Sequence, residues 1–177
     1  SEEEVLKEID EVSRDLERKN KTINEEIKKV SDRVAEEVRR VLEDIKRTSK
    51  DAVDDVRTRG LDETDIERHR RTSKRLLDEL RRLLEEHKRK SERISREDKK
   101  ILDEHRKFSE EVRKLIKDGA DLEKVVREVE ESVKESEERS RRLLEEVRRS
   151  VKKLEEDVTR LLEENKKSVD DIKERAR

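Results

Sequence analysis

The sequence predicts an all-α protein: a straight, elongated, up-down-up bundle of three helices with about 55 residues each. Three features of the 177-residue chain predict this fold. It contains no proline and only two glycines, so little in it interrupts a helix. Apolar residues make up 27% of it and recur at intervals of three and four, the spacing of one helix face. A polar pattern also repeats every 18 residues, which is about five helical turns.

The first helix is expected over residues 2–58. Its apolar row runs from Val5 to Val56, and polar residues interrupt it around Asn20 and Thr48. The row is narrow. A narrow row favours a slender bundle, because a helix buried on several sides needs a wider apolar face.

Each glycine marks a turn between helices. Gly60 and Gly119 are placed to adopt the left-handed conformation that closes a helix. Asp62 and Asp121 follow at the N-cap position, where a carboxylate accepts N–H groups of the next helix. The second helix is therefore expected over residues 63–117 and the third over residues 122–176, with residues 1–177 forming a single bundle.

Serine and histidine carry the 18-residue repeat. The three histidines stand 18 residues apart, and each precedes a serine by four positions. The repeated serines form one row per expected helix: Ser13, Ser31 and Ser49; Ser73, Ser91 and Ser109; Ser132, Ser150 and Ser168. Because the interval is about five turns, each residue type returns to the same face of a nearly straight helix.

Antiparallel pairing brings these rows to common levels. Short turns make neighbouring helices antiparallel, so residue numbers at one level add up to about 120 across the first turn and about 238 across the second. Each histidine then meets one serine from each neighbouring helix, with the serine of its own helix one turn away. The predicted layers are His69 with Ser49, Ser168 and Ser73; His87 with Ser31, Ser150 and Ser91; and His105 with Ser13, Ser132 and Ser109.

Other polar residues complete this pattern. Thr48 and Asn165 are expected beside Ser73, at the end of the His69 layer. A fourth layer is expected around Asp98, with Asn20, Asn24, Ser95, Ser136 and Ser140. An unpaired buried polar group costs about 1–3 kcal/mol. Sliding one helix by a turn would leave every layer unpaired, so these candidate buried networks are expected to fix the helix register.

Serine and histidine together also suggest a hydrolase, but the pattern does not favour one. A nucleophilic serine needs a base, a group that orients the base, and donors for an oxyanion. A continuous helix has its N–H groups already bonded, and no Gly-x-Ser-x-Gly turn occurs. We therefore expect no catalytic residues and no enzyme activity.

Cofactor, metal, nucleic-acid and membrane functions are not expected either. The chain has no cysteine, and each predicted layer holds only one histidine, too few ligands for a metal site. Its net charge is −2, with acids and bases interleaved and one aromatic residue, whereas nucleic-acid binding favours a basic face. No apolar stretch approaches the roughly 18 residues of a membrane span, and no targeting signal indicates a localisation.

The chain resembles computationally designed helical bundles with buried hydrogen-bond networks, including scaffolds used for helical cages and heterodimers. The resemblance covers the whole chain. It rests on the 18-residue polar rows, the related caps GLDE and GADLE, and Glu/Lys/Arg surfaces without proline or methionine. It implies a structural scaffold with no evolved substrate and hence no natural biochemical function.

The chain is expected to be a monomer that requires no partner. The alternative is a binding module or oligomer building block, in which the three helices leave a groove for a designed helical partner or self-associate.

Burial of the histidines also predicts a response to acid, because desolvation disfavours the charged imidazolium.

Overall fold

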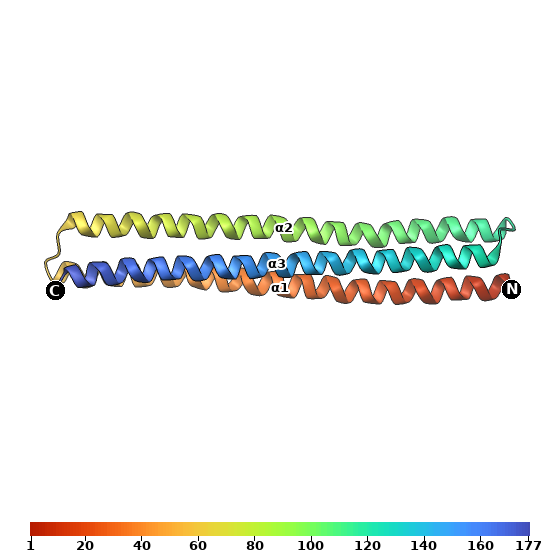
Figure 1. Ribbon diagram of the computed structural model, residues 1–177, viewed down its shortest axis with the longest axis horizontal. Coiled ribbons are helices and arrows are strands. Elements are labelled where there is room, and N and C mark those ends of the chain that lie inside the picture. Colours follow the sequence, from red (N-terminus) through yellow and green to blue (C-terminus); the bar gives the residue numbers. More distant parts are fainter. The chain divides into compact units, whose positions relative to one another are not determined.

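The computed structural model, which describes residues 1–177, is an all-α, up-down-up bundle of three mutually packed helices (Figure 1). They are α1 (Glu2–Thr58), α2 (Glu63–Lys117) and α3 (Leu122–Arg175). This confirms the predicted architecture and places the helix ends within one residue of those expected. The difference is at the end of α3, where Arg175 rather than residue 176 is the last helical residue.

The first turn closes α1 through backbone hydrogen bonds. The N–H of Gly60 donates to the carbonyl of Arg57 (3.0 Å), and the N–H of Leu61 donates to that of Val56 (3.0 Å). This pair of bonds is a Schellman motif, and it requires a left-handed residue just past the helix. Gly60 supplies that residue with a φ of 83°.

The second turn has the same construction. Gly119 has a φ of 88°, and its N–H donates to the carbonyl of Ile116 at 3.2 Å. Both following helices begin with an aspartate cap: Asp62 Oδ1 accepts from the N–H of Thr64 at 3.1 Å, and Asp121 Oδ1 accepts from that of Glu123 at 3.2 Å. Each carboxylate satisfies an N–H group that has no partner within its helix.

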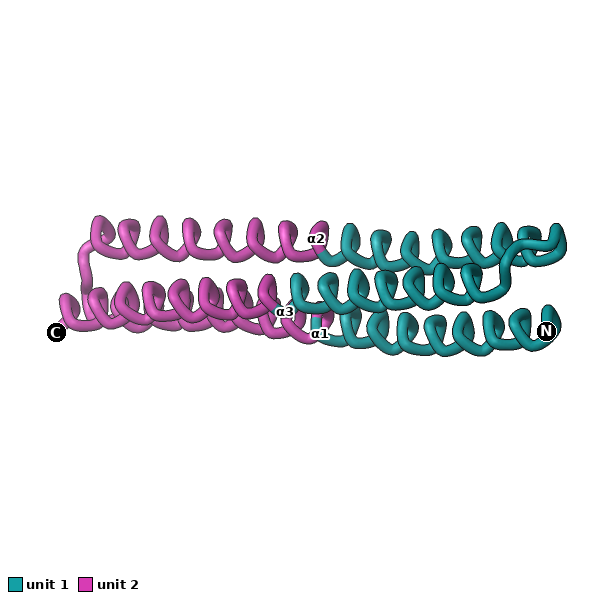
Figure 2. Tube along the Cα trace, turned by 45° about the vertical axis from the view of Figure 1, so that its right-hand side comes forward, with its two compact units in different colours: residues 1–30, 91–148 teal, residues 31–90, 149–177 magenta.

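Two compact units make up the chain, and each contains a segment of all three helices (Figure 2). Unit 1 is residues 1–30 and 91–148, and unit 2 is residues 31–90 and 149–177. Each unit therefore buries apolar residues from three helical segments against one another.

The apolar core of unit 1 draws on all three helices. Its buried cluster is Ile9, Leu16, Val112, Ile116, Val125, Val129 and Val133. The only aromatic residue, Phe108, is half-buried and packs against this cluster. In unit 2, a second cluster lies near the first turn and contains Ala52, Val53, Val56, Ile66 and Ile172. Such burial stabilises the fold by about 1.5–3 kcal/mol per large apolar side chain.

Replacing Gly60 with alanine is expected to lower the free energy of unfolding by about 1–2 kcal/mol, the cost of a left-handed conformation for a residue with a Cβ. Nothing lies within 4 Å of an added Cβ, so the cost comes from the backbone alone. Urea unfolding measures it. Gly60→Asn is the matched control and should lose less, because asparagine tolerates this conformation. Equal losses for the two variants would contradict this account of the turn.

Candidate functional site: the buried polar layers

The His69 layer of unit 2 joins all three helices. His69 on α2 is 2% exposed, and both of its ring nitrogens are hydrogen-bonded. Nε2 lies 2.8 Å from Ser49 Oγ of α1, and Nδ1 lies 2.6 Å from Ser168 Oγ of α3. Ser73 Oγ bonds Ser49 Oγ at 2.8 Å and lies 3.4 Å from Nε2. Since serine hydroxyls both donate and accept, every member of this layer is satisfied.

Asn165 and Thr48 extend the polar contacts between α1 and α3. Asn165 Nδ2 donates to Thr48 Oγ1 at 3.3 Å, and that hydroxyl in turn donates to the carbonyl of Asp44 at 2.8 Å. The Asn165 side-chain oxygen is buried and has no hydrogen-bond partner. This contact is therefore less completely satisfied than the His69 layer.

The His87 layer differs from the sequence-based pattern. His87 is 5% exposed, and its Nε2 donates to the backbone carbonyl of Ser31 at 3.2 Å. Its Nδ1 is buried without a hydrogen-bond partner. Ser150 is half-buried and is not joined to His87. Ser31 is buried, Ser91 is half-buried, and neither lacks a partner.

The His105 layer of unit 1 is satisfied on one side of the ring. Nε2 of His105 lies 3.0 Å from Ser13 Oγ of α1 and 3.2 Å from Ser109 Oγ of its own helix. Its Nδ1 is buried and unpaired, and Ser132 of α3 is half-buried without a bond to it. The structure thus joins two of the three expected serines to this histidine.

Asp98, also in unit 1, is the only fully buried carboxylate (0% exposed). Its Oδ1 accepts from Asn20 Nδ2 at 3.1 Å and from Ser140 Oγ at 2.8 Å, and Asn20 Nδ2 also donates to Ser140 Oγ at 3.2 Å. Its Oδ2 has no partner. None of the other expected members of this layer bonds Asp98. Asn24 and Ser95 are half-buried, and Ser136 is buried.

Burial shifts the pKa of these groups in opposite directions. Desolvation lowers the pKa of His69, His87 and His105 below the ordinary value of 6.5. The bond to the Ser31 carbonyl partly opposes this shift at His87, and the charge of Glu17 does so at His105. Desolvation raises the pKa of Asp98 above 3.8, although the bonds from Ser140 and Asn20 act against it. All four groups are thereby moved toward their neutral forms.

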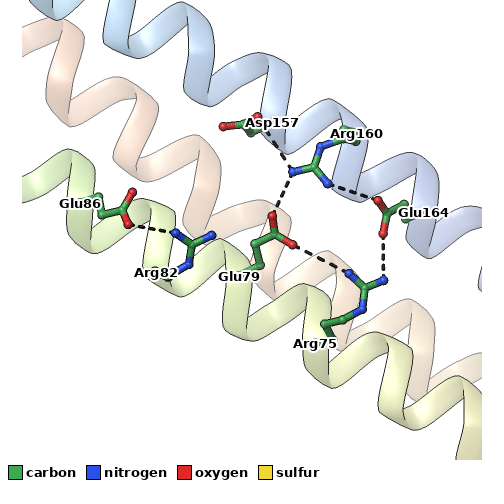
Figure 3. Close-up of polar contacts among 7 residues, drawn as sticks. All are labelled: Arg75, Glu79, Arg82, Glu86, Asp157, Arg160 and Glu164. Carbon is green, nitrogen blue, oxygen red and sulfur yellow. Dashed lines mark hydrogen bonds and ion pairs between the residues drawn. The ribbon is translucent and has the colours of Figure 1, made fainter.

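Ion pairs between helices were not predicted from the sequence. In unit 2, Arg75 and Arg160 alternate with Glu79 and Glu164 in a ring that links α2 and α3 (Figure 3). Its two bonds between helices, Arg75–Glu164 and Arg160–Glu79, are both 3.0 Å. Arg160 also lies 4.0 Å from Asp157. In principle, the pairing sums that located the polar layers give these partners too, since the residue numbers of each pair add up to about 238.

These surface contacts contribute modestly. Arg75 and Arg160 are 59% and 48% exposed, and isolated exposed pairs are worth about 0–1 kcal/mol. A closed ring restricts its members more than an isolated pair does. It therefore favours one register of α2 against α3 in the same way as the buried layers.

No family model matches the chain, and neither curated proteins nor solved structures show a significant similarity to it. The helices contain no stretch with the length and low charge that a membrane crossing requires. No group of three or more His, Cys, Asp or Glu side chains is arranged to hold a metal ion.

Acid is expected to destabilise the fold through its histidines. Below pH 6.5 the unfolded chain takes up protons that the buried imidazoles resist, since their pKa values are lowered in the folded state. The stability is fully present above about pH 6.5 and is lost as the pH falls toward the lowered values. Urea unfolding at pH 7.5 and 5.2 should show this loss. A variant with His69→Asn, His87→Asn and His105→Asn should lose less, and equal losses would rule out a histidine origin.

Acid should affect stability at Asp98 in the opposite direction from its effect at the histidines. Its raised pKa means that its contribution is fully present below about 3.8 and is lost as the pH rises through the raised value. Acidification therefore regains stability at this site. Asp98→Asn removes that gain, so this variant is expected to lose more stability than the parent between pH 7.5 and 5.2. An equal loss in the two proteins would show that Asp98 does not change its protonation state within this range.

Proposed function

We propose that the chain is a designed structural scaffold whose buried polar layers specify the register of its three helices. It has no natural biochemical function in this proposal, and its role is to hold three long helices in one arrangement. The observation that carries the proposal is the His69 layer, in which hydroxyls from α1 and α3 bond the two ring nitrogens of one histidine on α2.

The energetic argument concerns displaced registers. Moving one helix by a turn shifts its side chains by about 5.4 Å, which breaks the 2.8 Å and 2.6 Å bonds of His69. Each polar group left unpaired in the core then costs about 1–3 kcal/mol. An apolar seam made of valine, leucine and isoleucine distinguishes such registers less sharply, because one aliphatic contact largely replaces another. The polar layers therefore support the proposed role more strongly than the apolar core does.

The scaffold is proposed to act as a monomer. Only two large apolar side chains are exposed, Leu115 at 47% and Leu162 at 38%. They lie in different units, Leu115 in unit 1 and Leu162 in unit 2. Neither unit thus presents the broad apolar stripe with which a fourth helix packs into a groove.

Exchange of the bonded Asp98 layer tests the register role. The variant with Asn20→Leu, Asp98→Leu and Ser140→Ala should keep its helix content and unfold at an equal or higher urea concentration, because replacing a buried polar cluster often stabilises a core. It should lose uniqueness. Two-dimensional amide NMR is expected to show more than one set of resonances, or light scattering a mixture of oligomers.

The same layer supplies a matched control. Asn24, Ser95 and Ser136 were expected in this layer, but none of them bonds Asp98. The variant with Asn24→Leu, Ser95→Ala and Ser136→Ala should therefore retain one set of amide resonances and the parent's mass. A single sharp set of resonances and one mass for the exchanged bonded layer would count against register specification.

A further inference from the structure

Ser168, one of the repeated serines of α3, lines a surface groove. The groove lies in unit 2 between α2 and α3 and has a volume of about 390 Å³. His69 and Ser168 both line it, together with Arg68, Thr72 and Lys167. A small molecule in this groove therefore lies against the one hydroxyl that bonds Nδ1 of His69.

The hydrogen bonds around His69 form a directed chain. Ser168 Oγ lies 2.6 Å from Nδ1, Nε2 lies 2.8 Å from Ser49 Oγ, and Ser49 Oγ lies 2.8 Å from Ser73 Oγ. When Nε2 carries the proton and donates to Ser49, Nδ1 has a free lone pair that accepts the hydroxyl proton of Ser168. Ser49 then orients the imidazole, as the third group of a nucleophile–base pair must.

Charge in the groove is mostly compensated. Arg68 lies 3.5 Å from Asp65, and Arg175 lies 3.1 Å from Asp65 and 3.2 Å from Asp171. Lys167 lines the groove and has no ion pair. Lys167 is therefore the one cation lining the groove that no carboxylate neutralises.

The other two layers lack this arrangement. Ser150 and Ser132 occupy the same repeat position as Ser168, yet Nδ1 of His87 and of His105 has no hydrogen-bond partner. The repeat therefore provides two serines of matched sequence position and helix but without a bonded base.

We propose that Ser168 is a covalent modification site for small phosphonyl and acyl electrophiles, with His69 as its general base. With an alkyl fluorophosphonate, Ser168 Oγ bonds to phosphorus, the P–F bond breaks, and fluoride leaves with the bonding electron pair. Nδ1 of His69 takes the hydroxyl proton and later releases it to solvent. The adduct persists, because the helix N–H groups around Ser168 are already bonded and no oxyanion hole promotes a second step. This chemistry is stoichiometric labelling, and it is independent of the proposed scaffold role.

Labelling of the full chain tests the proposal. The protein is incubated with a small alkyl fluorophosphonate at pH 7.5, and peptide mass spectrometry follows adducts at Ser168, Ser150 and Ser132 in one sample. Ser168 should be labelled on the order of a hundredfold faster than the other two, the lower end of what a positioned base contributes. Absence of an adduct, or equal labelling of the three serines, overturns the proposal.

Two further measurements separate a base from simple exposure. The Ser168 labelling rate should fall as the pH drops and His69 becomes protonated, whereas a merely exposed serine shows no such step. His69→Gln, with its helix content checked by circular dichroism, should remove the advantage of Ser168 over Ser150. If that variant does not fold, the pH profile of the unaltered chain decides, with the protonation of His69 followed by the NMR signals of its imidazole. A labelling rate that stays constant over the pH range in which His69 becomes protonated overturns the role of His69.

Discussion

The structure depends on the cost of burying a polar group without a partner. Burying an amide, hydroxyl or imidazole lowers the stability of the fold by about 1–3 kcal/mol unless the protein replaces the hydrogen bonds that the group made to water. Every polar side chain inside this bundle therefore limits where the neighbouring helices can lie. His69 shows the constraint fully met, because Ser49 and Ser168 belong to two different helices and both hold the same ring. The hydrogen bonds of His69 therefore form only when α1 and α3 both lie in the correct position against α2.

The repeated layers are alike in sequence but not in bonding. His69 uses both ring nitrogens, whereas Nδ1 of His87 and of His105 is unpaired. The unpaired nitrogens and Oδ2 of Asp98 each carry part of the desolvation cost without compensation. A histidine repeated at equal intervals therefore contributes unequally to stability.

Helix ends, and the levels of the polar residues that bond one another, were predictable from the sequence because they follow from chain geometry. Gly60 and Gly119 carry a local signal for a helix end, and short turns then fix which residues of neighbouring helices meet. Bonding within a level was not predictable to the same degree. The pairing sums put Ser168, Ser150 and Ser132 at equivalent places, but only Ser168 bonds its histidine.

Bonding within a level is harder to predict than the level itself, because a hydrogen bond tolerates a smaller displacement than the error in the predicted level. An error of one residue along a helix is about 1.5 Å, and a hydrogen bond is lost over a smaller distance or by rotation of one side-chain torsion. Asn24, Ser95 and Ser136 illustrate this, since the pairing sums place them at the level of Asp98, yet none of them bonds it. The ring of ion pairs around Arg160 was missed for a different reason. In a chain with 58% charged residues, nearly every surface position has an opposite charge nearby, so no pair stands out.

The composition of the two units has a consequence for how the chain folds. Each unit combines one helical hairpin, residues 31–90 or 91–148, with a single segment from one end of the chain. Contacts within a hairpin are close in sequence and form rapidly, whereas the end segments close much longer loops. We therefore expect folding to start independently at the two turns, and the N-terminal and C-terminal segments to dock afterwards onto different hairpins. During synthesis, the hairpin at residues 31–90 is made before residues 149–177, the third segment of its unit. Unit 2 can therefore be completed only when the end of the chain has been synthesised.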